Sequence, residues 1–273
     1  SVTIPDSVTK IEKSAFEGCY ELTSLKISNS VTSIGEGAFR DCSGLTSLTI
    51  PSSVTTIGDY SFTGCCGLKT VKIPDSVTEI GICAFEFCTR ISSVTIPDSV
   101  TSIGRKAFKR CSWLSSVKIP NKVTSIKGGT FYGCNMLTEV HIPESVTEIE
   151  SYFDYDGRHI GAFEDCSLLS SIVIPNSVTL IGDRTCRNCA GLRSLTIGDS
   201  VNIIGNEAFY KCNLLVSVNI PNSVTCIGEL AFYDCRRLMT VTIPKSVNWI
   251  GEFAFKCSNI FNEQNKIQLI FKG

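Results

Sequence analysis

Apolar residues recur along this chain with a period of 23 residues, anchored on the valine of a step that usually reads Ser-Val-Thr. One insertion of nine residues is the only interruption of the register. The anchoring valines are Val8, Val31, Val54, Val77, Val100, Val123, Val146, Val178, Val201, Val224 and Val247. A fixed period of this length predicts a solenoid, because one repeat cannot bury its own apolar face and must stack on its neighbours.

Each repeat, here called a coil, contains three kinds of spacing, as residues 54–74 illustrate. Residues 71–73 alternate as in a short parallel strand, and Pro74 ends that strand where a missing N–H does least harm. Residues 54–57 predict a second extended segment, and the three-residue spacing within 61–68 predicts one or two helical turns. The residues that we expect to face inward are Val54, Ile57, Phe62, Cys65, Leu68, Val71 and Ile73.

Two columns of the repeat predict the centre of the core. One column holds phenylalanine in ten of eleven coils: Phe16, Phe39, Phe62, Phe85, Phe108, Phe131, Phe163, Phe209, Phe232 and Phe255. Cys186 takes the remaining position, where we expect a packing defect or a large neighbour that fills the space. The second column holds Cys19, Cys42, Cys65, Cys88, Cys111, Cys134, Cys166, Cys189, Cys212 and Cys235. We expect buried thiols there, because parallel Cα–Cβ vectors are poorly placed for disulfides.

The repeated phrase Leu-x-x-Val-x-Ile-Pro-x-Ser-Val-Thr-x-Ile-Gly-x-x-Ala-Phe-x-x-Cys resembles the BspA-like, Treponema-type leucine-rich repeats over residues 1–257. The resemblance implies an α/β repeat solenoid: a right-handed coil of eleven 23-residue units, mostly β by content, with short parallel strands on the concave side and short helical turns. Residues 258–273 would cap it, since 267–271 alternate like an edge strand. Members of that family are mostly cell-surface or secreted proteins that act in adhesion and protein binding.

Composition excludes several functions. The net charge is −1 and the 25 basic residues look scattered, so nucleic acid is not an expected partner. No apolar run approaches the ~20 residues that span a bilayer, so we expect no direct membrane insertion. The chain begins in mid-repeat at Ser1, which suggests a processed or excised piece. With only two histidines and no metal-ligand spacing, we expect no enzyme, no metal and no cofactor.

The insertion, residues 151–159, is the first candidate for partner binding, because insertions in repeat proteins form loops on one face. Its aromatic and charged residues are typical of binding hot spots. The alternative is a drifted loop without a partner. The candidate residues are Tyr152, Phe153, Asp154, Tyr155, Arg158 and His159.

Two further sets of outward residues are candidates for partner binding. Trp113 and Met136, followed by Leu168, are apolar where other coils are mostly small or polar. They could form a patch with the insertion, or the insertion could fold back and cover them, which we slightly favour. The outward column of the first strand is polar and mildly basic, with Lys72, Lys118 and His141 as candidate contacts for an acidic protein or glycan.

The position two residues after the anchoring valine is mostly polar at first and then becomes apolar in four consecutive coils, at Leu180, Ile203, Cys226 and Trp249. This stripe spans ~15 Å at ~4.8 Å per coil, and something should cover it. The C-terminal segment, a neighbouring domain or a second copy of the chain could do so, which makes the stripe a candidate for self-association.

Together these features predict a non-catalytic, protein- or glycan-binding leucine-rich-repeat module of a cell-surface or secreted adhesin-like protein. Two alternatives remain open. One is a structural, self-assembling repeat protein, and the other is an intracellular scaffold, since reduced thiols are tolerated in the cytosol.

Overall fold

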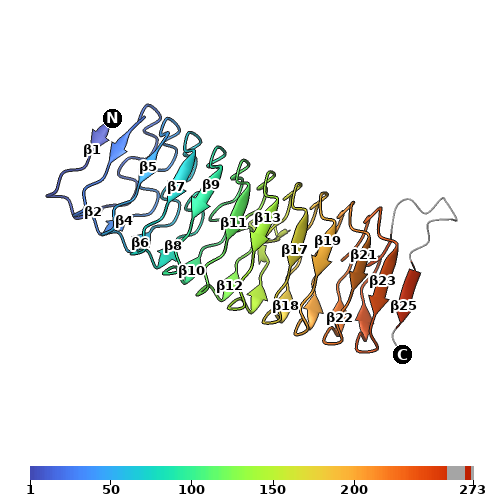
Figure 1. Cartoon of the computed structure of the whole chain (residues 1–273). Helices are drawn as coiled ribbons and strands as arrows, with labels where there is room; N and C mark the ends of the chain where they lie inside the picture. Colours follow the sequence, from blue (N-terminus) through green and yellow to red (C-terminus); the bar gives the residue numbers. More distant parts are fainter. Residues whose placement is uncertain (257–267, 272–273) are drawn as a thin grey trace. The chain divides into compact units, whose positions relative to one another are not determined.

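The computed structural model describes residues 1–256 and the strand at 268–271. Cys257 and most of the predicted cap, residues 258–267 and 272–273, lie outside the described residues. The chain is a parallel β-solenoid of about eleven turns of about 23 residues each, built from short strands and turns (Figure 1). It divides into two compact units: residues 1–124 with 130–137, and residues 125–129 with 138–273.

Unit 1 contains two walls of parallel strands. The first wall comprises β1 (Val2–Thr3), β3 (Leu25–Lys26), β5 (Leu48–Thr49), β7 (Thr70–Lys72), β9 (Ser93–Thr95) and β11 (Ser116–Lys118). The second wall is a five-stranded sheet of β2 (Lys10–Ile11), β4 (Ser33–Ile34), β6 (Thr56–Ile57), β8 (Glu79–Ile80) and β10 (Ser102–Ile103). Neighbouring strands pair in the register of the repeat, as Ile34 with Ile57 and Ile57 with Ile80.

Unit 2 repeats this plan. Its first wall comprises β13 (Glu139–His141), β17 (Ser171–Val173), β19 (Ser194–Thr196), β21 (Ser217–Asn219) and β23 (Thr240–Ile243), and β25 (Gln268–Phe271) pairs in parallel with β23. Its second wall is a six-stranded sheet of β12 (Ser125–Ile126), β14 (Glu148–Ile149), β18 (Leu180–Ile181), β20 (Ile203–Ile204), β22 (Cys226–Ile227) and β24 (Trp249–Ile250). The insertion lies between β14 and β18, which nevertheless pair in register.

The phenylalanine column forms the aromatic centre of the core, as predicted. In unit 1 the rings from Phe16 to Phe131 stack nearly parallel, with centroids of successive rings 5.2–5.8 Å apart. In unit 2 Phe209, Phe232 and Phe255 stack in the same way. Cys186, which replaces phenylalanine, is completely buried, and its carbonyl accepts a hydrogen bond from Cys212 Sγ at 3.4 Å.

The cysteine column is a ladder of thiols, and the structure has no disulfide among the described cysteines. Each thiol from Cys42 to Cys134 donates a hydrogen bond to the carbonyl of the phenylalanine column one coil earlier, at 3.1–3.3 Å. Cys19, in the first coil, is instead exposed. Burial raises the pKa of Cys42 to about 11 and that of Cys88 well above its ordinary value. These sulfurs therefore stay protonated and act as small core residues.

The predicted helical turns do not occur in the described part of the chain, where the segment between the second and first walls consists of consecutive tight turns. Alternate N–H groups bond locally and to the next coil: Ala38 donates to the carbonyl of Gly35, but Phe39 donates to that of Ser61. A helix would need every N–H for itself. Because every second N–H bonds to the next coil, only half of these groups remain for bonds within the coil. The left-handed φ of 57° at Asp41 also interrupts a right-handed helical path.

Candidate binding hairpin and neighbouring surfaces

The insertion folds into an antiparallel hairpin of β15 (Tyr152–Phe153) and β16 (His159–Ile160). Its turn is fixed by Asp154, whose N–H donates to the carbonyl of Arg158 at 2.9 Å and whose carbonyl accepts the N–H of Gly157. The Asp154 carboxylate also accepts the N–H groups of Asp156 and Arg158, at 3.0 and 2.8 Å. The aspartate thus closes the hairpin itself.

The base of the hairpin passes close to the backbone of neighbouring coils, and glycines make room for it. A Cβ at Gly128 would lie 2.6 Å from the Tyr152 nitrogen, and a Cβ at Gly161 would collide with the Arg184 carbonyl. Gly129 donates a hydrogen bond to the Gly161 carbonyl at 3.1 Å. Gly161 belongs to the glycine column of the repeat, whereas Gly128 lies outside that column, and its missing Cβ leaves room for the backbone of Tyr152.

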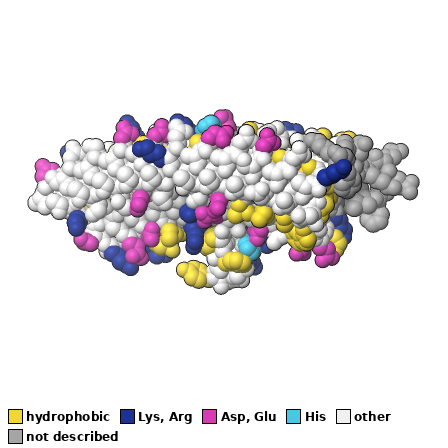
Figure 2. Space-filling view, turned by 90° about the horizontal axis from the view of Figure 1, so that it is seen from below, with side chains coloured by type: hydrophobic (Ala, Val, Ile, Leu, Met, Phe, Trp, Pro, Cys, Tyr) yellow, Lys and Arg dark blue, Asp and Glu magenta, His cyan; other side chains and the backbone are white. Residues whose placement is uncertain are grey.

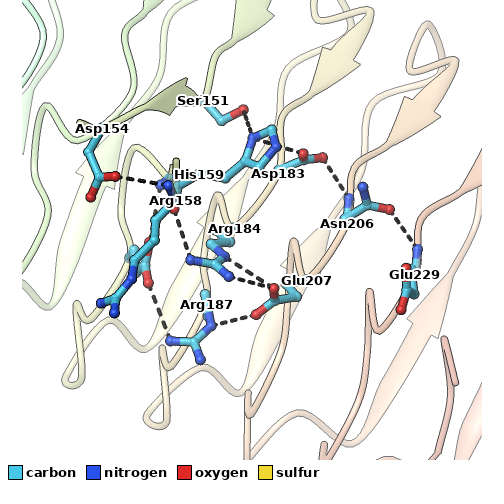
Figure 3. Close-up of polar contacts among 12 residues, drawn as sticks. Ser151, Asp154, Arg158, His159, Asp183, Arg184, Arg187, Asn206, Glu207 and Glu229 are labelled. Carbon is cyan, nitrogen blue, oxygen red and sulfur yellow. Dashed lines mark hydrogen bonds and ion pairs between the residues drawn. The ribbon is translucent and has the colours of Figure 1, made fainter. Parts of the chain in front are cut away.

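The return strand of the hairpin is fastened to the following coil (Figure 3). His159 Nδ1 lies 3.0 Å from Asp183 Oδ2, and Arg184 Nη1 donates to the His159 carbonyl at 3.0 Å. Ser151 Oγ lies 3.4 Å from the same imidazole nitrogen. This grouping is not a catalytic triad, because a triad uses both imidazole nitrogens, one for the serine and one for the aspartate.

A network of partly buried charges continues beneath the hairpin. Glu207 accepts hydrogen bonds from Arg184 at 2.8 Å and from Arg187 at 2.7 Å, and Arg187 Nη1 lies 3.3 Å from Glu164 Oε1 (Figure 3). Burial alone would raise the pKa of Glu207, but the hydrogen bonds from the two arginines lower it. Burial raises the pKa of Glu164 to about 7, against the opposing effects of the Gly161 N–H and Arg187. The network holds the support of the hairpin rigid.

The hairpin presents its apolar side chains to solvent. Tyr155 is fully exposed, and Phe153 is 63% exposed although its ring lies against His159 with centroids 3.8 Å apart. Arg158 is also exposed at the tip, whereas Tyr152 and Asp154 are partly buried. Two aromatic residues thus project from a fixed support.

The apolar column that begins at Trp113 remains uncovered. Leu168, which lies in the same unit as the insertion, is 50% exposed, so the expectation that the insertion buries this residue is wrong. Trp113 and Met136, in unit 1, are 56% and 47% exposed. Trp113 and Met136 lie in adjacent coils of unit 1, where Met136 donates its N–H to the carbonyl of Ser112. The hairpin belongs to unit 2 and instead packs against the coil that contains Asp183.

The predicted polar contacts on the first wall point outward. Lys72 on β7 and Lys118 on β11 are exposed in unit 1, and His141 on β13 is exposed in unit 2. Lys118 Nζ lies 4.0 Å from Asp98, an exposed pair that contributes little to stability.

The apolar stripe lies in register on the outer face of unit 2. Leu180 pairs with Ile203, Ile203 with Cys226, and Cys226 with Trp249 across β18, β20, β22 and β24. Ile203 and Trp249 are exposed, and Leu180 and Cys226 are partly exposed. Figure 2 shows hydrophobic side chains gathered in a band along this side of the molecule. Because Asp183 follows Leu180 by three residues and binds His159, the stripe begins beside the hairpin.

The structure also reveals a cluster that the sequence analysis missed. Arg105, Lys106, Lys109 and Arg110 share one turn segment of unit 1, so the basic residues are not all scattered. In the sequence, this cluster is visible as two basic pairs on either side of the core residues Ala107 and Phe108. The composition of the whole chain does not show such local grouping.

Within the described residues, no group of three or more His, Cys, Asp or Glu side chains could hold a metal ion. The same part of the chain contains no helix long and apolar enough to cross a membrane.

These features define a class of protein: a leucine-rich-repeat solenoid with a regular core and variable outward side chains. The chain belongs to the BspA type leucine rich repeat family, whose model matches residues 1–114, 33–156 and 159–268. Residues 157 and 158, in the turn of the hairpin, fall between matched segments. This match is to a repeat family and indicates no catalytic family.

Solved structures support the assignment. The chain is similar to a leucine rich cell surface protein of Faecalibacterium prausnitzii, with 27% identity over 99% of this chain and 87% of that one and a TM-score of 0.52. It is also similar to a leucine-rich-repeat protein of T. pallidum, with 29% identity over 59% of this chain and 72% of that one and a TM-score of 0.52.

The pneumococcal vaccine antigen PcpA shares the fold, with a TM-score of 0.55 and 17% identity over 99% of this chain and 68% of that one. No curated protein matches the chain.

Proposed function

We propose that this chain is a non-catalytic binding module of a cell-surface or secreted adhesin-like protein, which contacts a protein or glycan ligand through the hairpin. Membership of the BspA type family and similarity to a cell-surface leucine-rich protein support the location. Exposed polar residues of the first wall offer further contacts, Lys72 and Lys118 in unit 1 and His141 in unit 2.

One observation carries the proposal: the hairpin is fixed at its base and exposed at its tip. Asp154 closes its turn, Asp183 and Arg184 hold its return strand, and Phe153 and Tyr155 face solvent. Aromatic residues contribute strongly to binding when they become buried at an interface. A support that is already rigid loses little entropy on binding, so the exposed rings can contribute most of their burial free energy to affinity.

The test is a binding screen of the recombinant chain against a glycan array and purified extracellular-matrix proteins. For any ligand found, Tyr155→Ala should weaken binding by about thirtyfold, since an aromatic hot spot contributes about 2 kcal/mol or more. Tyr20→Ala is the matched control, because Tyr20 is also an exposed tyrosine but lies in the first coil. Equal affinity of the Tyr155→Ala variant and the unmodified chain for every ligand would remove the hairpin from the proposal.

A second candidate function is self-association through the apolar stripe. The observation that favours it is the in-register row of outward apolar residues on β18–β24, where Glu148 on the neighbouring strand marks the polar boundary. Light scattering after size exclusion should show a dimer or larger assembly that Ile203→Lys dissociates. Val173→Lys, at an exposed first-wall position of the same unit, is the control. A chain that stays monomeric at high concentration would exclude this candidate.

A further inference from the structure

We propose that residues 105–110 of unit 1, the basic segment, form a binding site for an acidic glycan that carries sulfate or carboxylate groups. The segment reads Arg-Lys-Ala-Phe-Lys-Arg, and compact basic runs of this kind bind polyanions such as heparin. The site is separate from the hairpin, and its failure would leave the function proposed above untouched.

The fold gathers the four cations on one surface. Ala107 and Phe108 are completely buried, so the two basic pairs that flank them are the outward part of the segment. Lys109 donates its N–H to the carbonyl of Lys106 at 3.0 Å, which closes a turn and brings the two pairs together. Arg105 and Arg110 are exposed.

Two aromatic rings from adjacent coils hold the second basic pair in place. Lys109 Nζ lies 5.5 Å from the centroid of the Phe87 ring and 5.7 Å from that of Tyr132. The Arg110 guanidinium carbon lies 5.8 and 6.0 Å from the same two centroids. Cation–π contacts on both sides restrict these side chains before a ligand arrives, which lowers the entropic penalty of binding.

The site carries an excess of positive charge. Glu86 lies 2.8 Å from Lys109 Nζ, and the side chains of this pair are mostly buried, so Lys109 has a structural partner. The neighbouring turn segments 82–87 and 130–133 contain no acidic residue other than Glu86. Together these three turn segments carry one negative charge, that of Glu86, and four positive charges. Two of them are guanidinium groups, whose paired donors match the oxygens of sulfate and carboxylate.

The surroundings favour a glycan over an acidic protein. Protein interfaces place apolar anchors at their centre and exclude charge from it, whereas this segment is mostly cationic. The Phe87 ring is 39% exposed, which leaves apolar surface for the C–H face of a sugar beside the cations. A chain of anionic sugars can also engage several cations at once, so that each contact increases the effective concentration for the next.

The experiment measures binding of a heparin octasaccharide to the whole chain by calorimetry at several salt concentrations. Arg105→Gln/Arg110→Gln should weaken binding by roughly tenfold per arginine and should reduce the slope of log K against log salt by about two. Arg237→Gln/Lys245→Gln is the control, because it removes two exposed charges of the same sign from unit 2. We expect its affinity to stay within about twofold of that of the unmodified chain.

Three outcomes decide the proposal. Equal losses in the two double variants would show general electrostatic attraction and overturn it. Tighter binding of polyglutamate than of the octasaccharide would identify an acidic-peptide site and overturn it as well. Loss of binding on desulfation of the octasaccharide supports it. Arg105→Lys/Arg110→Lys, which keeps the charge but loses the paired donors, should bind with intermediate affinity, and this variant keeps the test valid if the glutamine variant unfolds. Tyr155→Ala should bind the octasaccharide as the unmodified chain does.

Discussion

Replacing Phe85 by alanine tests whether the aromatic stack stabilises the solenoid. Phe85 is completely buried, and its ring lies 5.4 Å, centroid to centroid, from the rings of Phe62 and Phe108. The substitution removes one ring and both stacking contacts. A cavity remains, because the backbone on either side is held by hydrogen bonds from coil to coil, such as the one from the Phe85 N–H to the Ala107 carbonyl.

The expected loss follows from burial. A phenylalanine ring removes about 150–250 Å² from water, and truncation of a core phenylalanine to alanine costs about 3–5 kcal/mol in unfolding free energy. We expect a value near 4–5 kcal/mol, because the two stacked pairs add about 0.5–1.5 kcal/mol each beyond area burial. Phe16 supplies a matched control, since it is only partly buried and stacks on one ring, that of Phe39. Phe16→Ala should cost about half as much.

Urea unfolding followed by circular dichroism measures both variants. With a denaturant slope of about 2 kcal/mol per molar, Phe85→Ala should lower the urea midpoint by about 2 M. It could instead split the transition in two, because coupling in a repeat array passes only between neighbours. A loss for Phe85→Ala no larger than that for Phe16→Ala would refute the reasoning.

Four further variants test local features. Ser61 Oγ is buried without a hydrogen-bond partner among the described residues, so Ser61→Ala should raise the free energy of unfolding by about 1 kcal/mol; a loss would show that the hydroxyl is bound. Burial raises the pKa of Glu164 from 4.5 to about 7, so this residue's contribution to stability is lost as pH rises through that range. Unfolding at pH 5 and 8 should show a decrease of up to about 3 kcal/mol that Glu164→Gln abolishes, and an unchanged decrease would assign it elsewhere. Gly161→Ala should cost more than about 2 kcal/mol, because the added Cβ meets the Arg184 carbonyl. Protease cleavage at the hairpin should increase, and cleavage as slow as that of the unmodified chain would contradict this reasoning. Cys186→Phe restores the missing ring of the phenylalanine column and should raise the thermal midpoint of unfolding. A lower midpoint would show that neighbouring side chains already fill the site.

The sequence was most informative about the core. Residues such as Phe85 and Cys88 recur at the same place in ten of the eleven coils, and stacking the coils in register buries these columns together. The tight turns were misread as helical, because spacing of three residues fits both structures, and only the hydrogen bonds from Phe39 to the next coil distinguish them. The spacing of residues within one coil does not show whether a backbone N–H bonds within that coil or to the next one.

The candidate site was predictable in position but not in form. The aromatic and charged composition of residues 151–159 marked them as unusual, but their hairpin depends on the Asp154 turn and on contacts of His159 with Asp183 and Arg184. Arg184 lies 25 residues after His159 in the chain. The basic segment was overlooked because its importance depends on Phe87 and Tyr132, each one coil away in sequence.

The amino-acid sequence by itself determined the solenoid, its period and its buried columns, because a regular apolar pattern can be satisfied only by stacking. The tertiary structure decided which outward side chains meet. Outward positions are free of the packing constraint, so their pattern along the chain does not specify their neighbours. Only the tertiary structure places Tyr155 in solvent on a hairpin that is held at its base, and Arg110 against the rings of Phe87 and Tyr132.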